Sequence, residues 1–376
     1  MRTEHHRLTS CTPGTTRELQ SLHFGPLEQG RKAVIQASLH ADEPPGMLVA
    51  YHLRRELAAL EAEHRLRGEI VLLPMANPLG LSQRLLGRGL GRFDLGSGEN
   101  FNRRYQDLSA ATYAKLSAEI DAGHRPTVAS VRAALRQSCK ELPADSELAS
   151  LRKILLLQSI DADLVLDLHC DSEAVMHLYT ANPLWPQVEP LARLLGAEVS
   201  LLATESGGEP FDESCSMVWS HLNRRWQEHS GTPGPWPDAC VAVTVELRGE
   251  TDISHELAER DAAAILAYLA QRGFIEARLP ELPPLLREPT PLEGSIPVIS
   301  PRGGVLVHRQ LLGQWVQRGQ CIAEVIDPLS GEAIDLCSPV DGLLYAREHS
   351  RVVHAGMSIA KVAGSQAVRS GQLLSA

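Results

Sequence analysis

An alternation of short apolar runs with segments of helical period fills roughly the first 275 residues and limits the fold most strongly. The apolar runs expected to be strands are Lys32–Leu39, Gly68–Pro74, Leu164–His169 and Ala239–Leu247. The segments expected to be helices are Gly46–Arg65, Leu148–Ser159, Leu191–Leu195 and His255–Arg272. This alternation predicts an α/β fold with a mixed, mainly parallel sheet flanked by helices. The more polar stretch 108–149 is expected to be a helical insertion.

The composition and the periodicity of the sequence change at residue 279. The stretch LPELPPLLREPTPLEGSIP (279–297) is rich in proline and has no helical period, which predicts a semi-rigid linker. Short strand candidates separated by glycine turns follow and predict a small all-β module over 298–365, with a tail over 366–376. The catalytic domain is therefore expected to span 1–278.

Composition excludes several classes of protein. The 376 residues carry 36 Lys and Arg against 46 Asp and Glu, a net charge of −10 that argues against binding to nucleic acid or to a membrane surface. The seven cysteines are scattered and nowhere spaced C-x-x-C, which is typical of a reducing compartment. The N-terminus lacks the apolar core of a signal peptide, and no apolar run is long enough to span a bilayer. We therefore expect a cytoplasmic protein and leave a homo-oligomer open.

Residues 34–46 read VIQASLHADEPPG, in which an apolar run ends at His40 and Glu43 follows three positions later. The turn after a strand can bring these two positions together on one ion. The pair is then either an ordinary solvated strand end or half of a metal site. A catalytic zinc site needs about three protein ligands and keeps one position for water.

A third ligand is expected from a neighbouring strand end. In DLVLDLHCD, Asp167 and His169 share one face because side chains alternate along a strand. So apolar a strand is expected at the centre of the sheet, and ligands of open α/β sheets bind at the carboxyl ends of such strands. Asp167 either supports the site from behind or forms an ordinary strand-end hydrogen bond.

Glu246 closes a further apolar strand, CVAVTVELRGE, and is followed by Arg248. A carboxylate in a partly desolvated pocket can take a proton from a metal-activated water. Glu246 is therefore either a general base or a helix-facing glutamate paired with an arginine.

The glycine-rich stretch GRFDLGSGENFNRRY contains the adjacent residues Asn102 and Arg103. The planar guanidinium of arginine can hold a carboxylate through two hydrogen bonds. Arg103 is thus either an anchor for an anionic substrate or a solvated surface arginine.

Taken in order, HADE, NFNRRY, DLHCD and TVELRGE resemble the zinc carboxypeptidase superfamily, specifically its succinylglutamate desuccinylase/aspartoacylase branch. The resemblance covers roughly residues 30 to 275 and implies a zinc-carboxypeptidase-like catalytic domain. It implies that His40, Glu43 and His169 bind one Zn²⁺ ion. It also implies that Glu246 is the base and proton shuttle of a metal-assisted amide hydrolysis.

The same resemblance implies that Asn102 and Arg103 hold the substrate's carboxylate. Arg92, in GRF ahead of the loop, looks like the family arginine that polarises the scissile carbonyl and steadies the oxyanion; Arg84 and Arg88 lie nearby in the sequence. The string TVELR is closer to the peptidase side of the superfamily than to the deacylases.

The C-terminal module resembles the biotinyl/lipoyl-type barrel-sandwich fold in GGVLVH, SPVDGLLY and HAGMSIAKV. Carrier domains of that type present a lysine in a hairpin, where this chain has DPLSGEAID and no lysine. We therefore expect a structural or gating module, because relatives often end in a β-domain that walls the mouth of the active site.

Three hypotheses follow for the function. The first is a zinc-dependent amidohydrolase (deacylase) that cleaves the amide bond of an N-acyl amino acid or a similar small anionic amide. The alternative is a zinc carboxypeptidase acting on peptides, with Arg103 gripping the terminal carboxylate. The third, a metal-free binding protein, is disfavoured because all three ligand positions and the base are present.

Overall fold

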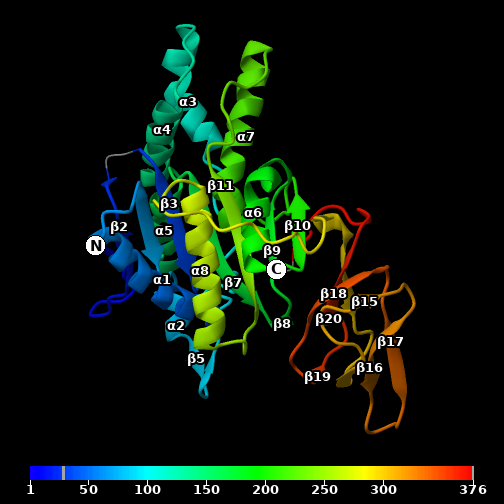
Figure 1. The fold of residues 1–376 in the computed structure, drawn as a ribbon. Helices are drawn as coiled ribbons and strands as arrows, with labels where there is room; N and C mark the ends of the chain where they lie inside the picture. Colours follow the sequence, from blue (N-terminus) through cyan, green and yellow to red (C-terminus); the bar gives the residue numbers. More distant parts are fainter. Residues whose placement is uncertain (28–29, 375–376) are drawn as a thin grey trace.

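The computed structural model describes residues 1–27 and 30–374. A nine-stranded sheet runs through this part of the chain in the order β1-β2-β4-β3-β7-β11-β9-β10-β12 (Figure 1). Its strands are β1 (Arg2–Arg7), β2 (Glu18–Phe24), β3 (Lys32–Ala37), β4 (Glu69–Leu73), β7 (Leu164–Asp171), β9 (His177–Ala181), β10 (Val199–Ala203), β11 (Val241–Gly249) and β12 (Thr290–Pro291). Strands β4, β3, β7 and β11 are mutually parallel, whereas β2 and β9 run antiparallel to their central neighbours. The expected mixed α/β architecture with a mainly parallel sheet is confirmed.

Helices cover both faces of the sheet, because its central strands are apolar on both sides. The helices are α1 (Pro45–Ala62), α2 (Pro78–Ser82), α3 (Ser109–Asp121), α4 (Val128–Lys140), α5 (Glu147–Ser159), α6 (Trp185–Leu195), α7 (Phe211–Ser230) and α8 (His255–Gln271), with short 3-10 helices at Asn182–Leu184 and Leu292–Gly294. One core lies under α1, α6 and α8, and the other under α3, α4, α5 and α7. The expected insertion 108–149 contains α3 and α4, which project from the body beside α7 (Figure 1).

The C-terminal part of the chain is built from short antiparallel strands. They are β13 (Ser295–Ile299), β14 (Gly304–His308), β15 (Trp315–Val316), β16 (Cys321–Ile326), β17 (Ala333–Cys337), β18 (Gly342–Arg347), β19 (Val352–Val353) and β20 (Ser358–Gly364). They form two sheets, β13-β20-β18-β15 and β17-β16-β14-β19, around a separate apolar core. We call this unit the C-terminal module. Strand β8 (Glu173–Ala174), which follows β7, pairs with β18 and fastens the module to the large domain.

The stretch expected to be a linker differs from the prediction at its C-terminal end. Thr290–Pro291 forms β12, the edge strand beside β10, and Ser295 already begins β13. A proline is tolerated there because an edge strand leaves one side without ladder hydrogen bonds. The last nine residues before the expected end of the linker, 289–297, therefore belong largely to ordered strands and not to a spacer.

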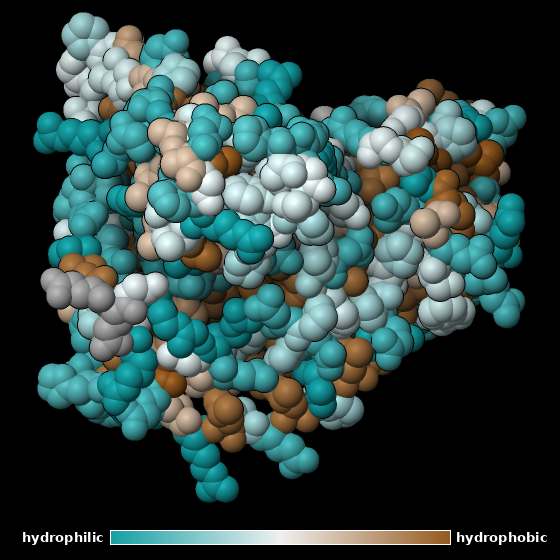
Figure 2. All heavy atoms as spheres, turned by 90° about the horizontal axis from the view of Figure 1, so that it is seen from above, coloured by the Kyte–Doolittle hydropathy of each residue, from teal (hydrophilic) through white to brown (hydrophobic). Residues whose placement is uncertain are grey.

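Within the described residues, none of the helices combines the length and apolarity needed to cross a membrane. Figure 2 shows a face covered mostly by hydrophilic residues, on which hydrophobic residues lie in small separate groups.

Candidate active site

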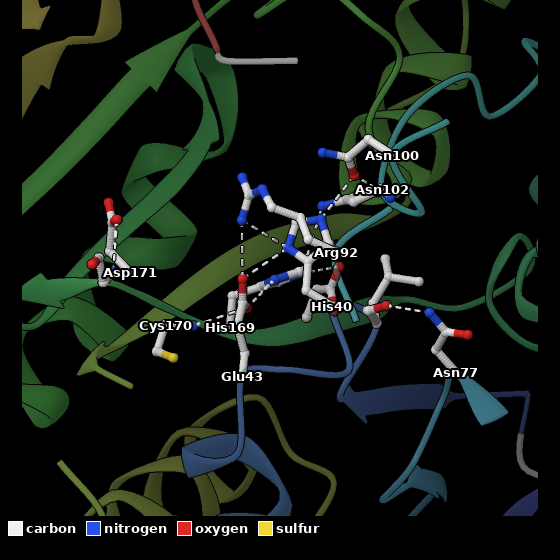
Figure 3. A network of polar contacts seen from close by, with 12 residues as sticks. His40, Glu43, Asn77, Arg92, Asn100, Asn102, His169, Cys170 and Asp171 are labelled. Atoms are coloured by element: carbon white, nitrogen blue, oxygen red, sulfur yellow. Dashed lines mark hydrogen bonds and ion pairs between the residues drawn. The ribbon is translucent and has the colours of Figure 1, made fainter. Parts of the chain in front are cut away.

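His40, Glu43 and His169 meet at the carboxyl ends of two neighbouring parallel strands (Figure 3). His40 follows β3 after Ser38, whose φ of 67° turns the chain out of the strand. Glu43 precedes α1, and His169 lies near the end of β7. The sheet topology thus brings together residues that are more than a hundred positions apart.

The three side chains are arranged around one point. Oε1 of Glu43 lies 2.8 Å from Nδ1 of His40, and Oε2 lies 2.8 Å from Nδ1 of His169. One ligand atom from each residue lies within 4.8 Å of the others, and all three side chains are buried. The group can therefore hold a metal ion, as the sequence motifs predicted.

The outer nitrogen of each imidazole also has a partner. Nε2 of His40 lies 2.8 Å from Oδ1 of Asn100, and Nε2 of His169 lies 3.0 Å from Oδ2 of Asp167. With the ring protons on Nε2, both Nδ1 atoms would offer a lone pair toward Glu43, which is the tautomer that a metal ligand requires. The Asp167 carboxylate therefore lies against the nitrogen of His169 that faces away from Glu43. Asn100, the corresponding partner of His40, was not identified from the sequence.

The electrostatics of the cluster suit a cation. Burial lowers the pKa of His40, and the positive charge of Arg92 lowers it further. Burial also lowers the pKa of His169. The negative charges of Asp167 and Glu43 have the larger, opposite effect and hold the pKa of this imidazole well above its usual value. Burial opposes ionisation of Glu43, yet both histidines keep the pKa of this carboxyl well below its usual value. Two carboxylates surrounding His169 thus create a site that is stabilised by positive charge.

Glu246 lies on β11 directly beside His169 of β7 in the strand register. Burial, followed by the charge of Glu43, raises the pKa of the Glu246 carboxyl to about 8. Its buried Oε2 has no hydrogen-bond partner among the described residues. Arg248 forms an ion pair with Asp261, so the alternative of a Glu246–Arg248 pair does not hold. Glu246 therefore faces the site with one carboxylate oxygen that no described residue pairs.

Arg92 reaches the same point from the loop before Asn100 (Figure 3). Its Nη1 lies 3.2 Å from Oε1 of Glu43 and 3.3 Å from Nδ1 of His40. Arg84 and Arg88 are exposed on the short hairpin of β5 (Arg84–Leu85) and β6 (Arg88–Gly89). Of these three arginines, Arg92 is the one that contacts the ligand residues.

Asn102 and Arg103 are buried together beside the cluster. Oδ1 of Asn102 accepts a hydrogen bond from the backbone N–H of Phe211 at 2.9 Å, which fixes the amide. Nη1 of Arg103 donates to the carbonyl of Asn102 at 2.7 Å. Arg103 is 9% exposed and lines the cavity described next, so the alternative of a solvated surface arginine does not hold.

A cavity of about 310 Å³ opens over these residues, with His40, Glu43, His169 and Glu246 in its wall. The C-terminal module and tail supply the opposite wall, with Ser295, Tyr345, Ser358, Lys361, Arg369 and Leu373. Lys361 forms an ion pair with Asp171 at the end of β7, and the N–H of Leu373 donates to the carbonyl of Ser206 at 2.9 Å. The sequence resemblance predicted a module at the mouth of the site, but none of these individual wall residues.

The pH dependence of stability should report on Glu213, an acid in the cavity wall near the start of α7. Burial, with the charge of Asp212, raises its pKa from 4.5 to about 7. Between about pH 5 and pH 7 the folded chain therefore holds a proton that the unfolded chain has released, and stability falls as pH rises. Between pH 5 and pH 8, the free energy of unfolding of Glu213→Gln should fall by about 1–3 kcal/mol less than that of wild type. The melting temperatures of metal-free wild type and variant should diverge as pH rises from 5 to 8; parallel curves would contradict the shift.

Fold and site together define an α/β protein with a candidate His-Glu-His metal centre at the carboxyl edge of its sheet. Residues 29–272 match the family model described as the succinylglutamate desuccinylase/aspartoacylase catalytic domain. The chain therefore belongs to the succinylglutamate desuccinylase/aspartoacylase family, whose members are deacylase hydrolases. No curated protein matches the chain significantly.

Solved structures of the same family cover nearly the whole chain. A family protein from Shewanella amazonensis is 27% identical, with a TM-score of 0.79 over 96% of this chain and 98% of its own. One from Shewanella frigidimarina is 24% identical, with a TM-score of 0.81 over 96% and 97%. The product-bound ectoine utilization protein EutE (DoeB) from Ruegeria pomeroyi is 16% identical, with a TM-score of 0.67 over 96% and 95%, and shares the fold.

Proposed function

We propose that the protein is a zinc-dependent amidohydrolase that releases the acyl group from an N-acyl amino acid or a similar small anionic amide. The observation that carries this proposal is Glu246, a cavity-facing carboxyl with a raised pKa in register with His169. A carboxyl in that position has the proton affinity of a general base near neutral pH.

The donor set fits a catalytic zinc ion. His40 and His169 would hold it through Nδ1 and Glu43 through its carboxylate, two imidazoles and one acid that leave a position open. When bound, the ion would polarise the scissile carbonyl and acidify a water molecule. Asn100 and Asp167 would keep both imidazole rings in the orientation and tautomer that binding requires.

The surrounding side chains would carry the remaining steps. Glu246 would take a proton from the attacking water and return it to the nitrogen of the leaving amine. The guanidinium of Arg92, next to Glu43, would neutralise the charge that develops on the carbonyl oxygen. Asn102 and Arg103 would hold the substrate's carboxylate and so set the position of the amide.

The small size of the cavity and its second wall favour the deacylase over the carboxypeptidase alternative. A volume of about 310 Å³ lies at the lower end of the range for small-molecule pockets. Its far wall comes from the C-terminal module and tail, where a peptide substrate would have to extend. We propose that the module, a barrel-sandwich unit without a carrier lysine, serves as this wall.

Replacing Arg103 by alanine should raise KM for carboxylate-bearing substrates by about 10- to 100-fold, because a charge-assisted hydrogen bond contributes about 1.5–3 kcal/mol. Effects on kcat should be smaller. The matched control is Arg104→Ala, since the neighbouring Arg104 side chain is 69% exposed and pairs with Glu99 at 3.0 Å. Steady-state kinetics of both variants measure the difference, and an unchanged KM for Arg103→Ala would refute the anchoring role.

A hydrolysis screen with added and chelated zinc tests the proposed function. Amine release from N-acyl amino acids that requires zinc would support the deacylase. Zinc-dependent loss of C-terminal residues from peptides would support the carboxypeptidase instead. A fully metallated protein that hydrolyses neither substrate class would overturn both assignments.

A further inference from the structure

Two cysteines lie opposite each other on the consecutive strands β16 and β17 of the C-terminal module. Cys321 opens β16 and Cys337 closes β17, and the two are direct partners in the antiparallel register, next to a register shift between Cys321 and Ala323. The backbone N–H of Ser338 donates to the carbonyl of Gln320 at 2.9 Å. A bond between the residues just outside the pair marks a non-hydrogen-bonded position, where facing side chains come closest.

This geometry suits a disulfide. Facing Cα atoms at such a position are separated by about 4.5 Å, and disulfides join Cα atoms about 4.4–6.8 Å apart. Directly opposed residues of neighbouring strands also project from the same face of the sheet. Burial raises the pKa of the Cys321 thiol, and nearby Asp335 and Cys337 raise it further.

Exposure separates this pair from the four buried cysteines of the large domain. Cys337 is exposed and Cys321 partly exposed, whereas Cys139, Cys170, Cys215 and Cys240 are buried. Cys11 is exposed but lies on the N-terminal segment of the large domain. Neither Cys321 nor Cys337 lines the cavity over His40, Glu43 and His169.

We propose that Cys321 and Cys337 form an oxidisable cross-strand dithiol that closes to an intrachain disulfide, with a small-molecule disulfide such as oxidised glutathione as the oxidant. The exposed Cys337 thiolate attacks one sulfur of the oxidant, whose S–S bond breaks and releases one glutathione thiolate. Cys321 loses its proton to solvent and attacks the Cys337 sulfur, and the second glutathione leaves as a thiolate. The two cysteines lose two electrons and two protons, and the oxidant gains two electrons.

The disulfide would fix the edge of the module. β17 is an edge strand, and the S–S bond would tie its end to β16 at the base of the hairpin that joins them. Exposed edges are the part of a sheet that frays and pairs with other chains, so the oxidised module should open less readily. The hydrolytic site should be unaffected, and the inference does not depend on the proposed function.

Mass spectrometry of the full-length protein after incubation with oxidised glutathione and alkylation of the remaining thiols tests the proposal. We expect a cross-linked peptide pair containing Cys321 and Cys337, formed at a rate independent of protein concentration and reversed by dithiothreitol. In Cys321→Ser, Cys337 should instead retain a glutathione adduct. Cys11→Ser should form the cross-link as the wild type does.

Two results would overturn the assignment. One is a stable glutathione adduct on Cys337 of the wild type with no link to Cys321. The other is modification of Cys11 while both module cysteines remain alkylated as free thiols. Limited proteolysis provides a second readout that does not depend on catalysis. After oxidation, protease should cleave the β16–β17 hairpin more slowly in the wild type than in Cys321→Ser.

Discussion

Replacing Glu246 by glutamine is expected to lower kcat by about 10²- to 10⁴-fold, the usual contribution of a general base. The amide has nearly the shape of the carboxyl but cannot accept the proton of the attacking water. Because Glu246 lies beside the ligand set and is not one of its members, zinc content should stay at the wild-type level. KM should change little, since the carboxylate anchor Arg103 is untouched. Turnover rates and metal analysis of the same preparation measure both quantities.

Two controls separate loss of the base from loss of the fold. Burial destabilises the ionised form of Glu246, which is why its pKa is raised. The glutamine variant cannot ionise, so the metal-free variant should melt no lower than metal-free wild type at pH 8. Glu250→Gln is the matched control, because Glu250 lies just beyond β11 and its pKa is likewise raised, to about 7, mainly by burial. Near-normal turnover of Glu246→Gln in a zinc-loaded protein would remove Glu246 from the role of base.

The motifs that carry the site could be recognised from sequence for a physical reason. His40 and His169 each interrupt an apolar run at its carboxyl end, and a buried strand tolerates such residues only where they find polar partners. Alternation of strands with helices predicts that the two strands are parallel, which places both carboxyl ends at one edge of the sheet. Asn100 lacks such a signal, because a polar residue in a glycine-rich loop is ordinary whether or not it contacts an imidazole.

The other half of the cavity could not be predicted in the same way. Lys361 and Asp171 are 190 positions apart and meet only because β8 pairs with β18 when the two units dock. Docking of one folded unit on another leaves no periodic pattern in either sequence. Helix α7 is a different case, because its buried residues Phe211, Cys215, Trp219, Leu222 and Trp226 recur at helical spacing. The apolar period of this segment could therefore have predicted the helix.

Replacing His169 by alanine is expected to weaken zinc affinity by more than about 100-fold, because loss of an outer-shell partner alone costs about 10- to 100-fold. Turnover should fall with metal occupancy, and added zinc should no longer raise the melting temperature, since a ligand stabilises a fold only as far as it binds. Asp167→Asn supplies the intermediate step of this series. It keeps a group next to Nε2 of His169 but removes the charge, so affinity should fall by about 10- to 100-fold.

Two further variants serve as controls for the zinc affinities of His169→Ala and Asp167→Asn. His124→Ala removes an exposed histidine of the helical insertion and should bind zinc as the wild type does. Glu43→Gln preserves the volume of the third ligand, so a loss of zinc there cannot be attributed to a cavity in the core. Titration with a zinc-sensitive chromophore orders the variants by affinity. If His169→Ala and Glu43→Gln both bound zinc as tightly as His124→Ala, the ion would have to sit elsewhere, and the base assigned to Glu246 would have no activated water beside it.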